Sequence, residues 1–137
     1  MCVSACGSSV RWLWNAHARP RDVVTWDPWS TPTQVSPRQR TILGRASVAG
    51  LLHSIQQAAP PVVVKVDIDD PRLEWAMARA VVEQHPPRVA EFYFEHHTRV
   101  PEMLDAWGNG SSLGELTDTY ALMLAGRHKG IRTHAWV

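Results

Sequence analysis

The run Val62-Val-Val-Lys-Val66, inside the stretch PVVVKVDID from Pro61 to Asp69, constrains the fold more than any other part of the chain. Four valines in five positions favour a strand, because β-branched side chains are restricted in a helix and pack well on a pleated surface. Apolar residues at successive positions, rather than alternate ones, indicate burial on both faces, which is typical of a parallel sheet.

Helical and extended patterns alternate on both sides of this strand. The sequence predicts a first helix that Ser47 caps and Pro60 ends, followed by the strand over 61–69. A second helix runs from Asp70 to before Pro86, and a strand over 91–97 follows it. The last two elements are a helix over 117–128, which Gly126 or Gly130 ends, and a strand over 131–137. Strands that alternate with helices indicate an α/β fold. We expect a three-layer sandwich around a mostly parallel sheet of three to four strands.

Residues 1–41 have a different character. This segment contains four prolines and four of the seven tryptophans, and only Asp22 to Asp27 has the pattern of a short strand. Because proline disrupts helices and sheet interiors, and clustered aromatic residues favour contact surfaces, we expect a leader that is loosely ordered or docked. The predicted domain then covers residues 42–137.

Composition narrows the range of partners. The 137 residues carry a formal net charge of +1, which gives no electrostatic reason to expect nucleic acid as a partner. No run of about 18 apolar residues exists, so we expect no membrane span. An intracellular location is expected, and the arginine-containing N-terminus leaves organelle targeting open.

Polar side chains gather where the predicted strands end. They are Asp67 and Asp69 after the first strand, Glu95, His96 and His97 after the second, and His134 on the third. Because ligands bind beyond the carboxyl ends of parallel strands, we expect these residues at one edge of the sheet. They could hold a metal ion, or they could be polar residues that orient a loop. The loop GNGSSLG, over 108–114, is a weaker candidate for binding phosphate.

The strand ends also resemble a family. VVVKVDIDDPRLE and EFYFEHH are similar to segments of Rossmann-like methyltransferases of the FkbM type, which use S-adenosylmethionine. Lys65, Asp67 and Asp69 match one motif, and Glu95 with His96 or His97 matches the next. A group of algal and other protist proteins shares the segments DIDxPxxE, EFYFEHH and GIRxHxW. The resemblance implies a Rossmann-like fold and S-adenosylmethionine as cofactor.

This resemblance covers residues 42–137 and departs from the family at Asp69-Asp70, where the family has Glu-Gly. It implies the C-terminal half of the fold, because the sequence predicts no first strand and glycine turn in residues 1–41. Three hypotheses follow. The chain is a non-catalytic module whose open sheet edge is covered by a homo-oligomer or a partner chain; it is a methyltransferase with Asp67, Asp69, Glu95 and His97 as catalytic residues; or it is a metal-dependent enzyme that uses Asp67, Asp69, Glu95, His96, His97 and His134.

Overall fold

A computed structural model describes residues 2–4, 23–27, 39–43, 46–68, 70–84, 87–97 and 114–135. The strands in these ranges are β1 (Cys2–Ser4), β2 (Val23–Asp27), β3 (Gln39–Leu43), β4 (Val62–Val66), β5 (Val89–Phe94) and β6 (Arg132–Ala135). The helices are α2 (Val48–Gln57), α3 (Pro71–Gln84) and α5 (Leu116–His128). The predicted helix and strand order from Ser47 onward is therefore confirmed.

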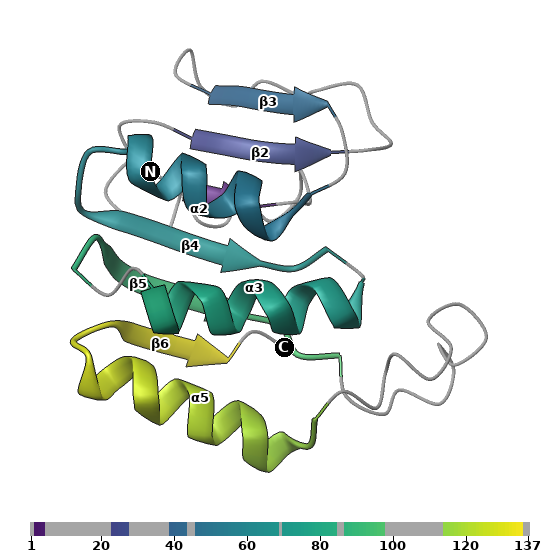
Figure 1. Cartoon of the computed structure of the whole chain (residues 1–137), viewed down its shortest axis with the longest axis vertical. Coiled ribbons are helices and arrows are strands. Elements are labelled where there is room, and N and C mark those ends of the chain that lie inside the picture. The colour runs from purple at the N-terminus through teal and green to yellow at the C-terminus, as the bar shows by residue number, and fades with distance from the viewer. Residues whose placement is uncertain are drawn as a thin grey trace.

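The six strands form one sheet in the order β3-β2-β1-β4-β5-β6, and every neighbouring pair is parallel (Figure 1). The α/β class and the parallel sheet are thus confirmed. Strands β4, β5 and β6 are the three expected within residues 42–137, and β1, β2 and β3 extend the sheet beyond β4. The strand order reverses between β1 and β4, and the order 3-2-1-4-5-6 is that of Rossmann-like sheets.

This sheet corrects the expectation of three to four strands, because six described strands pair in it. Strands lie on both sides of the point where the order reverses, and β1 pairs with β2 on one side and with β4 on the other. Strand β2 confirms the short strand predicted between Asp22 and Asp27. The described parts of the predicted leader therefore belong to the sheet by direct strand pairing.

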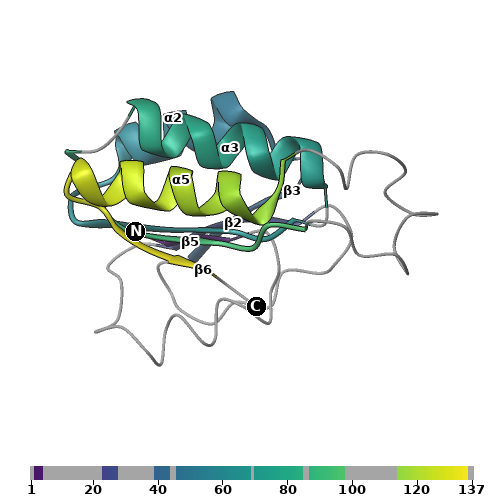
Figure 2. The ribbon, with the colours of Figure 1, turned by 90° about the horizontal axis from the view of Figure 1, so that it is seen from below.

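The described helices α2, α3 and α5 all cover the same face of the sheet (Figure 2). A parallel connection is almost always right-handed, so successive strands added in one direction place their helices on one side. The sequence analysis expected helices on both faces, but the three helices that it predicted form a single layer (Figure 2).

Capping residues and a glycine fix the helix ends that the sequence predicted. Ser47 accepts a hydrogen bond from the Gly50 N–H at 3.1 Å, which caps α2. Asp70 accepts one from the Leu73 N–H at 3.1 Å, which does the same for α3. Helix α5 ends at His128, and the glycine that terminates it is Gly130 rather than Gly126, because Gly130 has a φ of +85° that favours glycine.

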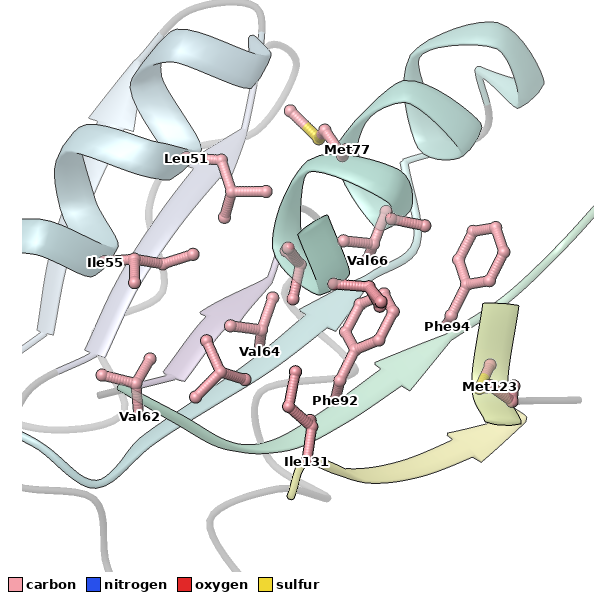
Figure 3. Close-up of a cluster of buried hydrophobic side chains, with 14 of the residues drawn as sticks. Leu51, Ile55, Val62, Val64, Val66, Met77, Phe92, Phe94, Met123 and Ile131 are labelled. Atoms are coloured by element: carbon pink, nitrogen blue, oxygen red, sulfur yellow. The ribbon is translucent and has the colours of Figure 1, made fainter. Parts of the chain in front are cut away.

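The main core lies between the sheet and the helices (Figure 3). Alternate residues of β4 and β5 point toward the helices, and these are Val62, Val64, Val66, Phe92 and Phe94. They meet buried side chains from α2, α3 and the C-terminal elements: Leu51, Ile55, Met77, Met123 and Ile131. The intervening residues therefore lie on the other face, which places Lys65, Glu91 and Tyr93 there.

Gly126 is needed where α5 crosses β6. A Cβ atom at this position would lie 2.6 Å from Cγ2 of Thr133, whose side chain is buried. We expect Gly126→Ala to lower the unfolding free energy by about 1–3 kcal/mol, because overpacking outweighs the gain in helix propensity. Urea unfolding measures the change.

The matched test is Thr133→Ser in the Gly126→Ala background. Serine removes the colliding methyl group and keeps the hydroxyl that donates to the Met123 carbonyl at 3.0 Å. Most of the lost stability should return. A Gly126→Ala protein as stable as the original chain would contradict the close approach.

Candidate functional site

The carboxyl ends of β4 and β5 lie side by side, as the sequence analysis expected. The two strands are parallel, with Val66 opposite Phe94, and the Glu95 N–H donates to the Val66 carbonyl at 3.1 Å. This last bond extends the pairing one residue past the strands. It brings the residues that follow, Asp67 and Glu95, to the same edge.

Asp67 and Glu95 interact directly through a side-chain hydrogen bond. Two carboxyl groups can share such a bond only when one of them carries a proton. Lys65 decides which one, because its buried ammonium group pairs with Oδ2 of Asp67. The cation favours ionised Asp67, so the proton resides on Glu95.

The electrostatics of Glu95 agree with this assignment. Burial, followed by the charge of Asp67 and the hydrogen bond with it, raises the pKa of Glu95 to about 7. The positive charges of His97 and Lys65 oppose the shift and do not cancel it. Glu95 therefore exchanges its proton near neutral pH, which suits a general acid or base.

His97 connects this carboxyl pair to helix α3. Its Nδ1 lies 2.7 Å from Oε2 of Glu74, and its Nε2 lies 3.5 Å from Oε1 of Glu95. The other oxygen of Glu74, Oε1, accepts a hydrogen bond from the Ile68 N–H at 2.9 Å. Glu74 is fully buried, so these contacts fix both the carboxylate and the imidazole ring.

These contacts form a continuous chain of ionisable groups, which we name the acid–histidine relay: Glu74, His97, Glu95, Asp67 and Lys65. A buried carboxylate holds an imidazole, and the imidazole faces a carboxyl group that titrates near pH 7. The arrangement can accept a proton from a ligand at the sheet edge and stabilise the charge that results.

The sequence analysis did not place Glu74 in the site. It appeared only within the DIDxPxxE segment of the family resemblance. A signal was nevertheless present, because Glu74 shares the inward stripe of α3 with Met77, Ala78 and Val81, all of them buried. A charged residue in an apolar stripe requires a buried partner.

His96 and His97 are adjacent in sequence and have different surroundings. His96 stacks on Trp75 and on Phe94, with ring centroids 4.9 and 5.2 Å away, and its Nδ1 contacts the hydroxyl of Thr119. These contacts join β5 to α3 and α5. They support the alternative in which one of the two histidines orients a loop.

His134 also lies apart from the relay. It is opposite Tyr93 in the β5–β6 pairing, its ring stacks on Tyr93 at 4.4 Å, and its Nε2 lies 3.5 Å from Oε2 of Glu91. Glu91 in turn accepts from the Tyr93 hydroxyl at 2.9 Å and pairs with Arg132. His134 therefore joins a second polar cluster. Asp69 and residues 98–113, which include most of the GNGSSLG loop, lie outside the described residues.

The metal site was an alternative in the sequence analysis, and one of its residues, Asp69, lies outside the described residues. In the ranges that the structure covers, no group of three or more histidine, cysteine or acidic side chains is arranged to hold a metal ion. The physical reason is that His96 and His134 turn to separate partners, and that Asp67 binds both Glu95 and Lys65.

Comparisons with known proteins add no information about this site. No family model, no curated protein and no solved structure matches this chain. Among the described helices, none combines the length and the apolar character needed to cross a membrane.

Removing the buried carboxylate tests its structural role. Glu74→Ala leaves the Ile68 N–H and His97 without their buried acceptor, so we expect the unfolding free energy to fall by roughly 3 kcal/mol. Glu83→Ala on the exposed side of the same helix is the control and should change it by less than about 0.5 kcal/mol. Equal effects would contradict the central role of Glu74.

The raised pKa of Glu95 predicts a pH-dependent stability. A raised pKa means that the folded state favours the neutral carboxyl, so this contribution is complete below about pH 4.5 and is lost as the pH rises through about 7. Glu95→Gln mimics the neutral form. Above pH 7 it should exceed the original chain in stability by on the order of 1 kcal/mol, after allowance for solvent screening.

Thermal unfolding at several pH values provides the measurement. The difference between the original chain and Glu95→Gln should be small at low pH and should grow through the neutral range. Asp67→Asn removes the neighbouring charge and should move this change to lower pH. A difference that is constant with pH would contradict the assignment of the proton to Glu95.

Proposed function

We propose that this protein is a Rossmann-like methyltransferase that binds S-adenosylmethionine at the reversal of strand order and uses Glu95 as a general base. The observation that carries the proposal is the reversal between β1 and β4, with an acid–base group beside it at the ends of β4 and β5. In open α/β sheets, ligands bind in the crevice outside the strand ends at this position. The choice of cofactor rests on the sequence resemblance.

The residues present fit an adenosine-containing cofactor. Strand β2 ends at Asp27, and in Rossmann-like sheets an acid at this place holds the ribose hydroxyl groups. Asp67 directly follows β4, next to the reversal, where its carboxylate pairs with Lys65 and shares a hydrogen bond with Glu95.

The chain's own residues would supply proton transfer. When bound, the cofactor would supply an electrophilic methyl group, and its sulfur would leave as a neutral thioether. The ionised carboxylate of Glu95 would accept the proton that a hydroxyl or amine of the second substrate loses. His97 and Lys65 stabilise that carboxylate beforehand, and Glu74 holds His97 in place.

Calorimetric titration with S-adenosylmethionine tests the cofactor site. We expect binding to the full chain, and Asp27→Asn should weaken it by roughly tenfold, because one hydrogen bond to a charged group is lost. Glu83→Gln, on the exposed side of α3, is the control and should bind normally. No heat at millimolar cofactor would contradict the proposal and favour a non-catalytic scaffold.

Titration near pH 7 in two buffers with different ionisation heats tests Glu95 separately. A sulfonium cation favours the ionised form of nearby acids, so binding should release a proton from Glu95. Glu95→Gln should bind without this release. Proton release that persists in Glu95→Gln would assign the exchange to another group.

A further inference from the structure

Helix α3 meets the segment after β5 through two adjacent pairs of side chains. Glu74 contacts His97, with its Oε2 lying 2.7 Å from Nδ1 of the imidazole. The neighbouring residues, Trp75 and His96, stack their rings, whose centroids lie 4.9 Å apart and whose planes differ by 14°. A polar contact and an aromatic contact therefore lie next to each other between the same two segments.

His96 is held by three elements at once. Besides the contact with Trp75 of α3, its ring stacks on Phe94, a core residue of β5, with centroids 5.2 Å apart. Its Nδ1 contacts the hydroxyl of Thr119, a buried residue of α5. A Cβ atom at Gly114 would lie 3.3 Å from its Cε1, so the residues before α5 also confine the ring. These close contacts together hold the imidazole in one place.

The place of His96 in the sequence connects it to the acid–histidine relay. It stands between Glu95 and His97, which are both members of the relay. Strand β5 ends at Phe94, and the Glu95 N–H extends the β4–β5 ladder by one bond. His96 and His97 follow that bond, so the contacts of their side chains with α3 and α5 help to place them. A fixed His96 also fixes the peptide units on both sides, from which Glu95 and His97 extend.

We propose that Trp75 and His96 are positioning residues of the relay, because their stack holds α3 and the end of β5 at the separation that lets His97 reach Glu74. The carboxylate of Glu74 has no proton to donate, so it accepts a hydrogen bond from Nδ1 of His97. The other ring nitrogen, Nε2, then faces Oε1 of Glu95 at 3.5 Å. The inference rests on the proposed function, in which Glu95 exchanges a proton and His97 stabilises its charge.

Nuclear magnetic resonance of the full chain with isotope-labelled histidine measures the contact of His97 directly. A ring N–H that donates to a buried carboxylate gives a signal far downfield and exchanges slowly with water. The original chain should show this signal for His97, and its absence in His97→Gln assigns it. Trp75→Leu removes the stacking ring, so the signal should disappear or exchange at least about tenfold faster. Trp75→Phe restores an aromatic ring and should keep the signal.

His96→Leu is the second variant, and it should change the His97 signal in the same way as Trp75→Leu does. It removes the stack from the other side, so it tests the proposal even where the loss of the larger ring prevents folding. Trp75 also packs against the core, so urea unfolding of each variant is measured in parallel.

Ile55→Ala is the matched control for lost stability. Ile55 is fully buried and lies in the last turn of α2, which the chain connects to the start of β4, whereas the relay lies at the other end of that strand. The cavity should lower the stability of the fold, but the His97 signal should remain unchanged.

A His97 signal that persists unchanged in both Trp75→Leu and His96→Leu would overturn the proposal. So would an original chain without the signal, or its loss in Ile55→Ala, since the signal would then follow overall stability. The measurement uses no cofactor. A failed titration with S-adenosylmethionine would therefore count against the proposed function and leave the positioning of His97 in place.

Discussion

The buried carboxylate of Glu74 is the interaction on which the candidate site depends. It has no exposure to solvent, and an unpartnered charge in such a place would cost several kcal/mol. Its two oxygens accept from the Ile68 N–H, after β4, and contact His97, after β5. One side chain of α3 therefore ties the helix to the ends of two strands. The positions of Asp67 and Glu95 follow from that connection.

The parallel sheet explains why an acid–base group forms at this edge. Parallel strands all end on the same side, so residues 28 positions apart, such as Asp67 and Glu95, become neighbours. Lys65 then makes them unequal, because its ammonium group is held inside the sheet and stabilises the charge on Asp67. The remaining proton stays on Glu95 and can be exchanged near neutral pH.

The two polar clusters lie at different places on the sheet. The relay occupies the ends of β4 and β5, whereas Glu91, Tyr93, Arg132 and His134 form their cluster along β5 and β6.

The sequence by itself determined the elements from Ser47 onward. Their periodicity, caps and prolines act locally, so the helices and the strands β4, β5 and β6 could be predicted, and the shared edge followed from parallel topology. The pairing of β1 and β3 could not be predicted, because those segments are short and gain their structure from distant strands. Only the tertiary structure distinguished His97 from His96 and brought Glu74 into the site. The reason is that the role of an imidazole depends on the group it contacts. The group that His97 contacts, Glu74, lies 23 positions away in the sequence.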